Sequence, residues 1–130
     1  MGNCFSWGIA EGAIYAPNGD FLGTGYSGNG QFKNKSDCCG VKDHGPLPVG
    51  LYTIEAPITH PKCGAYTLGL TPDKSNDMKG RAGFKIHGDS IANPGTASDG
   101  CIILNRIART RIWESQIRCL RVVSTLGGAS

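Results

Sequence analysis

The sequence predicts a mainly β domain with one short helix near the C-terminus, and three observations lead to this fold class. Twenty glycines and seven prolines among 130 residues exclude a coiled coil or a helical bundle, because these residues are the poorest helix formers. A hydrophobic content of 39% is too high for a charged disordered chain. Short apolar segments separated by turn-forming residues are typical of β-strands. A chain of this length is expected to form a single domain over residues 1–130.

The first half of the chain is predicted to contain a hairpin and two further strands. Residues 13–26 are expected to form the hairpin, because Asn18-Gly19 lies between two apolar segments and favours a tight turn. A loop rich in Ser, Gly, Asn, Lys and Pro follows over residues 27–48. Apolar residues then mark strands over 51–55 and 65–70.

The second half is predicted to hold three strands and the helix. Residues 83–87 and 101–104 are short apolar segments on either side of a polar loop. Asn105 is a favourable N-cap, which predicts a helix over about 106–116. The β-rich segment 119–123 completes the fold.

Hydropathy and charge argue against a membrane-spanning protein and against a nucleic-acid-binding protein. No segment approaches the ~20 apolar residues of a membrane span, and the N-terminus lacks the basic and apolar regions of a signal peptide. We therefore expect no membrane span and a protein made in the cytoplasm. The net charge of +3 is too small to indicate nucleic acid. Residues 101–130 carry five Arg and one Glu, which indicates either a solvated helix face or a basic flank beside a site for an anionic substrate.

Six cysteines are many for a chain of 130 residues, and three explanations stay open. The first is disulfides, with Cys38 or Cys39 bonded to Cys63 as the best pairing, because these residues belong to long loops. The second is ordinary buried thiols, for Cys4 and Cys119. The third is a zinc site, although no pair has the C-x2-C spacing of structural zinc sites. Its ligands would be drawn from Cys38, Cys39, His44, His60 and Cys63.

The most informative pair of residues is His87 with Cys101. His87 ends one predicted strand and Cys101 begins the next, directly after Ser98-Asp99-Gly100. If the two strands pair antiparallel, the end of one lies beside the start of the other, which brings imidazole and thiol within reach of a Cys–His dyad. Gly100 allows close backbone approach, so main-chain N–H groups could face a developing oxyanion. The alternative is a buried cysteine that lies near a surface histidine by chance.

The order of these residues along the chain limits the enzyme class. All three histidines precede Cys101. Papain-like proteases and the small bacterial cell-wall cysteine peptidases place cysteine before histidine, so both are excluded if Cys101 is the nucleophile. Chymotrypsin-like cysteine proteases need two barrels and a longer chain. Sortases and L,D-transpeptidases keep histidine first in a small β fold, and the Thr-Leu-x-Thr-Cys strand of sortases is absent.

Two motifs carry a resemblance to a known family. Ile86-His87-Gly88, followed by Ser98-Asp99-Gly100-Cys101-Ile102, resembles the His-Gly and Ser-x-Gly-Cys-Ile/Val signature of L,D-transpeptidase catalytic domains. The segments 25–28, 45–54 and 80–89 are similar to the type VI secretion L,D-transpeptidase effectors, whose members attack peptidoglycan. The resemblance covers about residues 7–124, nearly the whole chain.

The resemblance implies a small β sandwich or barrel and an acyl-enzyme mechanism that needs no metal or cofactor. Cys101 would attack the carbonyl between meso-diaminopimelate and D-Ala in a tetrapeptide stem, with His87 as the base. The N–H groups of Gly100 and Cys101 would form the oxyanion hole, and Ser98 would shape the turn or orient His87. Water as acceptor gives L,D-carboxypeptidase activity, and an amine acceptor gives exchange or transpeptidation.

The sequence departs from the family pattern at two positions. The family often has His after the motif Ser and Arg after Ile/Val, where this chain has Asp99 and Ile103. Arg81 is the expected substitute for that Arg, with Arg106 as a second candidate. Together with Gly88 and Asp99, Arg81 makes up the expected substrate-binding set. The negative charge of Asp99 should raise the pKa of the thiol.

Partners and destination also follow from the resemblance. It implies peptidoglycan tetrapeptide stems as substrate and an antibacterial role. A secretion system would deliver the protein to the periplasm of target bacteria, and an immunity protein would protect the producer. We expect a monomer that binds no nucleic acid. The alternative, from another class, is a non-catalytic cell-wall-binding module on the same fold.

Overall fold

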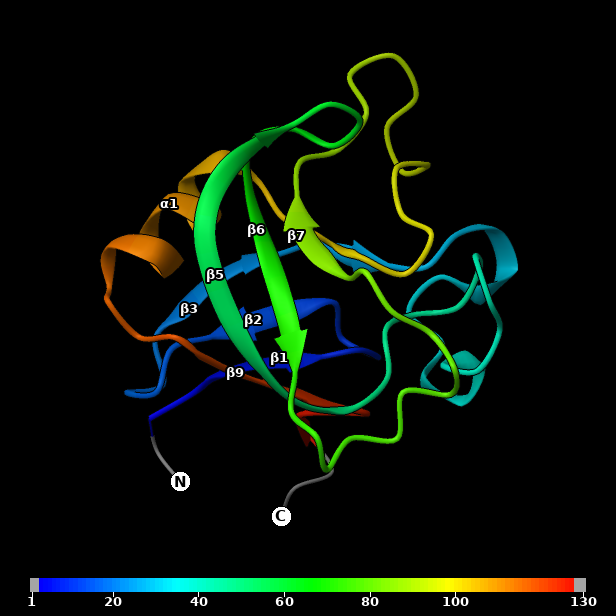
Figure 1. Cartoon of the computed structure of the whole chain (residues 1–130), viewed down its shortest axis with the longest axis horizontal. Helices are drawn as coiled ribbons and strands as arrows, with labels where there is room; N and C mark the ends of the chain where they lie inside the picture. The colour runs from blue at the N-terminus through cyan, green and yellow to red at the C-terminus, as the bar shows by residue number, and fades with distance from the viewer. Residues whose placement is uncertain (1–2, 128–130) are drawn as a thin grey trace.

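A computed structural model describes residues 3–127, and its main feature is one nine-stranded β-sheet with the order β3-β2-β1-β9-β5-β6-β7-β8-β4 (Figure 1). The mainly β fold with a short α-helix is confirmed. In chain order the elements are β1 (Phe5–Gly8), β2 (Ala13–Tyr15), β3 (Phe21–Thr24), β4 (Tyr26–Ser27), two 3-10 turns (Gly30–Phe32 and Ser36–Cys38), β5 (Gly50–His60), β6 (Gly64–Pro72), β7 (Lys85–His87), β8 (Ile102–Ile103), α1 (Arg106–Glu114) and β9 (Cys119–Val123).

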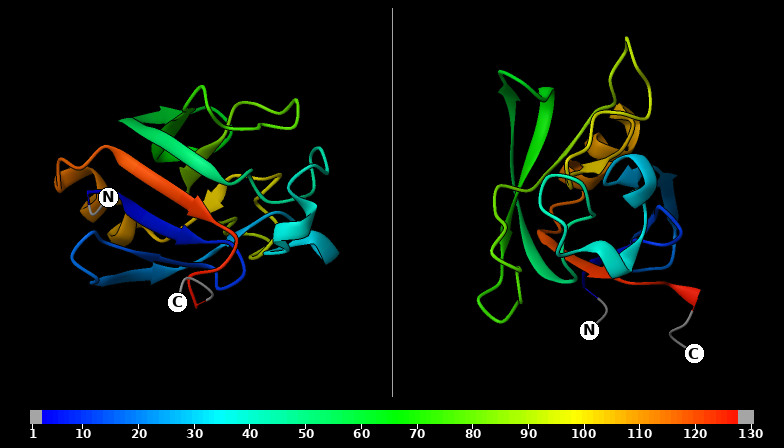
Figure 2. Two further views of the ribbon diagram at one scale, coloured as in Figure 1. Left: turned by 90° about the horizontal axis from the view of Figure 1, so that it is seen from below. Right: turned by 90° about the vertical axis from the view of Figure 1, so that its right-hand side faces the viewer.

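The sheet curls until its two edges meet. Its edge strands, β3 and β4, are consecutive in the chain and are separated by Gly25 alone. Glycine is required there, because a Cβ on this residue would lie 1.7 Å from the backbone oxygen of Ile103. The hairpin of β5 and β6 consequently faces the layer that contains β1, β2 and β3 (Figure 2). This closure agrees with the sandwich or barrel that the resemblance implies.

Several predicted elements are confirmed with changed lengths. The β2–β3 hairpin forms as predicted, and β5 and β6 extend the strands predicted at 51–55 and 65–70. The helix follows its predicted N-cap, since the Asn105 side chain accepts the N–H of Ala108 at 2.8 Å. It ends at Glu114 after nine residues, and no helix within residues 3–127 is long and apolar enough to cross a membrane.

The sequence patterns do not predict β1, which lies inside the sheet between β2 and β9. This strand has four residues, three of them buried, and so it lacks the polar–apolar alternation that marks a half-buried strand. It pairs antiparallel with β2 and parallel with β9, at the other end of the chain. Its strand conformation therefore depends on long-range partners.

The predicted disulfide between Cys38 or Cys39 and Cys63 is wrong. All three are free thiols, and the disulfide joins Cys4 to Cys119, whose Cα atoms are 4.5 Å apart. The parallel pairing of β1 with β9 explains this bond, because it sets Phe5 opposite Leu120 and thereby brings the preceding residues, Cys4 and Cys119, beside each other. Loop membership carried no information about which cysteines meet.

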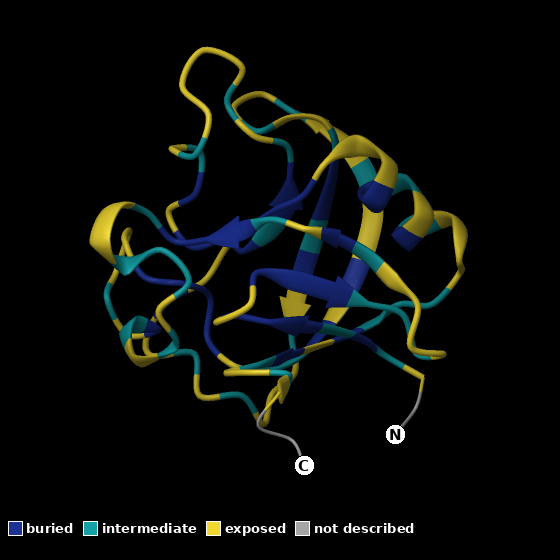
Figure 3. Ribbon diagram, turned by 180° about the vertical axis from the view of Figure 1, so that it is seen from behind, coloured by how far each residue is buried: buried dark blue, intermediate teal, exposed yellow. Residues whose placement is uncertain are grey.

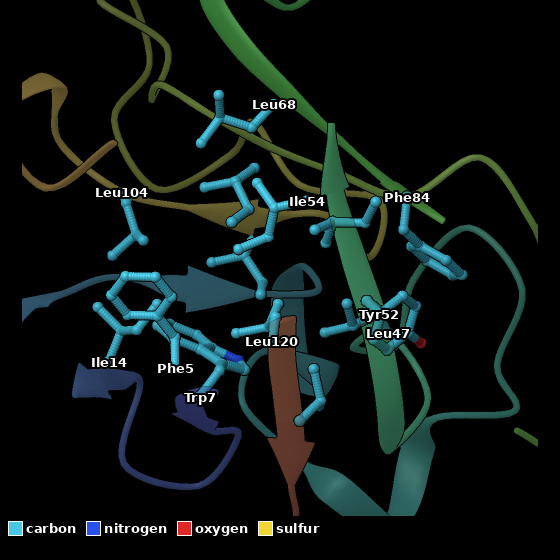
Figure 4. Packing of buried hydrophobic residues seen from close by; sticks show 14 of the residues in the cluster. Phe5, Trp7, Ile14, Leu47, Tyr52, Ile54, Leu68, Phe84, Leu104 and Leu120 are labelled. Atoms are coloured by element: carbon cyan, nitrogen blue, oxygen red, sulfur yellow. The ribbon is translucent and has the colours of Figure 1, made fainter. Parts of the chain in front are cut away.

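The core fills the space inside the curled sheet, and the buried residues gather on the strands in the middle of the molecule, whereas the loops around them are mostly exposed (Figure 3). Aromatic and aliphatic side chains from both halves of the chain interlock there (Figure 4). Each large apolar side chain contributes about 1.5–3 kcal/mol when fully buried. The largest fully buried side chains are Trp7, Tyr52, Phe5, Ile9, Ile14, Leu47, Ile54, Leu68, Ile86, Ile102, Leu104 and Ile112.

Two segments project from the body of the sheet on the same side (Figure 1). One is the tip of the β5–β6 hairpin around residues 60–64, and the other is the loop 88–101 between β7 and β8. The short strands β7 and β8 lie at the base of these projections. The fold thus places His87 and Cys101 between the β5–β6 hairpin tip and the loop that joins β7 to β8.

Candidate active site

The strands that carry His87 and Cys101 pair in parallel, so the antiparallel arrangement expected from the sequence is wrong. The register sets His87 opposite Ile103, two residues beyond Cys101. Parallel neighbours need a long crossover connection, and the loop after His87 supplies it before the chain enters β8. The two residues are therefore offset along the sheet instead of directly opposite.

Despite this offset, His87 and Cys101 line one cavity of about 540 Å³. The tip of the β5–β6 hairpin and the loop between β7 and β8 both contribute to its lining. Acidic and basic groups share the space, which suits a zwitterionic ligand. Its other charged or titratable residues are His60, Lys62, Cys63, Lys85, Asp89 and Asp99.

A second cavity, of about 300 Å³, lies on another side of Cys101. Its polar lining comes from Lys42, Asp43, Arg81 and Asp99, and its apolar lining includes Phe84. Cys101 and Asp99 line both cavities. Cys101 therefore lies where two partly open cavities meet.

The imidazole of His87 is oriented by its own backbone. Its Nδ1 lies 2.9 Å from the carbonyl oxygen of Gly88, and a carbonyl can only accept, so Nδ1 carries the proton of the neutral ring. Nε2 then keeps its lone pair and can accept a proton. Burial lowers the pKa of His87, and the charges of Arg109 and Lys85 lower it further. At neutral pH the ring is a neutral base.

The thiol of Cys101 is also neutral at rest. Burial raises the pKa of Cys101, and the charges of Cys63 and Asp99 add to the increase. The effect of Asp99 has the sign expected from the sequence. The backbone N–H and the ammonium group of Lys85 act in the opposite direction and lower this pKa. Proton transfer to His87 must therefore accompany attack by the sulfur.

Ser98 shapes the turn that leads into Cys101, and its hydroxyl forms no hydrogen bond to His87. Its Oγ accepts the N–H of Gly28 at 2.8 Å and the N–H of Gly100 at 3.0 Å, and its hydroxyl donates to the Cys101 carbonyl at 2.5 Å. The Gly100 N–H, expected to serve an oxyanion, is thus engaged by Ser98. Within residues 3–127, the Cys101 N–H donates to no protein acceptor.

Arg81 is buried, and its guanidinium binds backbone carbonyls. Nη2 donates to the Asp99 carbonyl at 3.0 Å, directly before the turn. The other donor–acceptor distances are 2.6 to 3.0 Å, to the carbonyls of Cys39, Pro46 and Gly45. Four of its five N–H groups are therefore engaged, although it lines the smaller cavity as expected of a substrate-binding residue. Of the rest of that expected set, Gly88 lines the larger cavity and Asp99 lines both.

Three cavity residues escaped the sequence analysis of the dyad. His60 and Cys63 come from the β5–β6 hairpin tip, and no local pattern connects that tip with β7. Lys85 did carry a signal, because it lies two residues before His87 and alternate strand residues share a face. The considered zinc ligands do not assemble, since no group of three His, Cys, Asp or Glu within residues 3–127 could hold a metal ion.

Comparison with known families connects this site to a class of proteins. Residues 23–128 match the family model of the Tlde1 domain, and the matched segment includes β4 to β9, with His87 and Cys101. Comparison with curated proteins and with solved structures gives no match. The family match covers most of the chain, and so the protein belongs to the Tlde1 domain family, a family of type VI secretion effector domains.

Proposed function

We propose that this protein is a cysteine enzyme that cleaves or exchanges the terminal D-Ala of peptidoglycan tetrapeptide stems. One observation carries the proposal: Cys101 and His87, with the Nε2 of His87 free to accept a proton, line the same cavity. Membership of an effector family supports a peptidoglycan substrate in a target bacterium. The motif resemblance supplies the substrate class.

The chemistry follows from the protonation states of the dyad. The sulfur of Cys101 attacks the carbonyl carbon of meso-diaminopimelate while its proton moves to Nε2 of His87. The Cys101 N–H stabilises the oxyanion. Collapse breaks the C–N bond, and the imidazolium protonates the amine of D-Ala as it leaves. Water or an amine then cleaves the thioester, with His87 again as base.

The two cavities suit acyl transfer. The stem and the leaving amine lie on different sides of the attacked carbon, and Cys101 lines two cavities. A D-amino acid carries a carboxylate, for which Lys42 in the smaller cavity offers a positive charge. An amine acceptor could occupy the space that D-Ala vacates, which makes exchange compatible with the same site.

Delivery and protection complete the proposal. The substrate lies outside the inner membrane, so the effector would act in the periplasm of the target cell after transfer by a secretion system. The producing cell would then need an immunity protein that blocks the site.

The test is digestion of purified tetrapeptide muropeptides with mass spectrometry of the products. Cys101→Ala should release no D-Ala, because the covalent step has lost its nucleophile. Cys101→Ser should be nearly inactive, since a hydroxyl needs stronger activation than a thiol. His87→Ala should lose about 10²–10⁴-fold in rate.

His44→Ala is the matched control for loss of an imidazole, because His44 lines neither cavity, and its activity should stay close to that of the wild type. Circular dichroism shows whether each variant folds. Full activity in a folded Cys101→Ala protein would end the cysteine-enzyme proposal. Muropeptide binding without any product from the wild type would favour the cell-wall-binding module.

A further inference from the structure

Ser27 lies outside both cavities and yet contacts the backbone of the proposed nucleophile. It is fully buried on β4, and its hydroxyl donates to the carbonyl oxygen of Gly100 at 2.6 Å. Its Oγ also accepts the N–H of Leu47 at 3.1 Å, which holds the hydroxyl in one orientation. A buried hydroxyl thus forms a hydrogen bond to the peptide group between Gly100 and Cys101.

Because a trans peptide group is planar, this hydrogen bond to its carbonyl also fixes the direction of its N–H. The carbonyl and the N–H of one planar peptide group point to opposite sides. Because the Gly100 carbonyl points to Ser27, the Cys101 N–H of the same peptide points away from Ser27. Within residues 3–127 this N–H has no protein acceptor, so it remains available to a ligand.

The preceding peptide group is held separately. The Asp99 carbonyl accepts from Arg81 at 3.0 Å, and the Gly100 N–H donates to Ser98 at 3.0 Å. The Ser98 hydroxyl also holds the Cys101 carbonyl, on the far side of the next peptide group. Gly100 lies between these contacts, and its φ of +142° lies in a region that glycine adopts freely. A glycine at this point has the widest choice of backbone angles, so the orientation of the next peptide group depends on its own contacts. Among residues 3–127, Ser27 is the side chain that donates to the carbonyl of the Gly100–Cys101 peptide group itself, and so it fixes the direction of the Cys101 N–H.

We propose that Ser27 is a positioning residue that aims the Cys101 N–H at the oxyanion of the acylation step. The inference rests on the proposed function for its substrate, but it concerns any acyl transfer to this thiol. It predicts that loss of the Ser27 hydroxyl slows acylation of Cys101 and leaves other reactions of the thiol unchanged.

Two probes separate these effects. p-Nitrophenyl acetate acylates a thiol through a tetrahedral oxyanion: the sulfur forms the thioester, p-nitrophenolate leaves, and the thiol proton passes to His87. Iodoacetamide alkylates the same sulfur with loss of iodide and forms no oxyanion. The ratio of the two rates, followed at Cys101 by mass spectrometry of its peptide, therefore reports on the oxyanion donor.

Ser27→Ala should lower this ratio about 10- to 100-fold, since removal of a whole oxyanion donor costs about 10²–10³-fold. The pH profile of alkylation should not move. Ser115→Ala is the matched control, because the Ser115 hydroxyl also donates to a carbonyl, of Ile112 at 2.6 Å, and accepts an N–H, of Ile117 at 3.0 Å. It lines neither cavity beside Cys101, and its ratio should equal that of the wild type.

An unchanged ratio in folded Ser27→Ala, an equal fall in Ser115→Ala, or a wild-type Cys101 that is not acylated overturns the inference. A wild type that is acylated but releases no D-Ala refutes the proposed function alone. If Ser27→Ala does not fold, the wild type still tests the inference. The amide proton resonance of Cys101 should shift downfield when acetaldehyde adds to the thiol as a hemithioacetal, and an unmoved resonance contradicts it.

Discussion

Two buried arginines hold the backbone on either side of the proposed dyad. Arg81 binds the carbonyl before Gly100. Arg109 binds four carbonyls, two in β6 and two in the residues directly before helix α1. Within residues 3–127, neither guanidinium forms an ion pair with a carboxylate. A Cβ on Gly100 would lie 2.6 Å from Arg81, and a Cβ on Gly88 would lie 2.9 Å from Arg109. The two motif glycines therefore make room for these guanidinium groups.

The protonation states of the dyad predict its pH dependence. Burial raises the pKa of Cys101 and lowers that of His87, so the neutral pair persists over the range between the two values. Alkylation of Cys101 by iodoacetamide should still accelerate above about pH 8.5, the ordinary thiol value. Release of D-Ala should fall only below about pH 6.5, where an ordinary imidazole is half protonated.

The measurement is the alkylation rate of Cys101 across the pH range, beside the rate of an unfolded control peptide that carries the same motif. A thiolate–imidazolium pair would behave differently, because its thiolate exists already at low pH and gives a rate plateau around neutrality. Such a plateau would contradict the neutral pair.

At the scale of secondary-structure elements, the hairpin of β5 and β6 does more than the sequence indicates. Its tip contributes His60, Lys62 and Cys63 to the larger cavity. Two backbone N–H groups, of Lys62 and Cys63, donate to Nδ1 of His60 at 3.0 Å, so Nε2 carries the proton of the neutral ring. The hairpin thus lines one side of the larger cavity and orients the Nε2–H of His60 as a hydrogen-bond donor.

Helix α1 allows a test of local stabilisation. The Asn105 side chain accepts the Ala108 N–H at 2.8 Å, which satisfies one of the free donors at the start of the helix. Asn105→Ala should lower the free energy of unfolding by about 1 kcal/mol. Urea denaturation of the wild type and the variant measures this difference in the free energy of unfolding. Asn105→Asp keeps an acceptor and should stay close to the wild type, and an equal loss in both variants would show that the cap is not the cause.

At the scale of the whole molecule, the Cys4–Cys119 disulfide closes a loop of 115 residues between the two ends of the chain. It lies at the start of the parallel pair β1 and β9, inside the sheet. A crosslink of such separation restricts the unfolded chain strongly, so it stabilises the closed sheet. The oxidised form is the one suited to a compartment outside the cytosol.

Cys4→Ser should lower the free energy of unfolding by about 2–4 kcal/mol, because the unfolded chain regains this freedom. The intact mass of the wild-type protein should increase by two hydrogens on reduction, because the Cys4–Cys119 bond is opened. Cys38→Ser removes a free thiol and should change neither the mass shift nor, by more than a few tenths of a kcal/mol, the stability. A protein whose mass does not change on reduction would contradict the bond.

Local patterns in the sequence determined several elements. The Asn-Gly turn predicted the β2–β3 hairpin, and Asn105 predicted the start of α1. The motifs around His87 and Cys101 selected two residues that share a cavity. Each of these features depends on neighbours within a few positions, which is the range over which turn chemistry, capping and strand ends act.

Tertiary structure alone decided which segments meet. Alternation of side chains defines a strand but not its partner or direction, so the parallel pairing of β7 with β8 and the existence of β1 were not predictable. Cys4 meets Cys119, and Ser27 meets Gly100, across separations of 115 and 73 residues. Such contacts form only when the sheet curls and its edges come together at Gly25, because closure of the whole fold brings these segments within bonding distance.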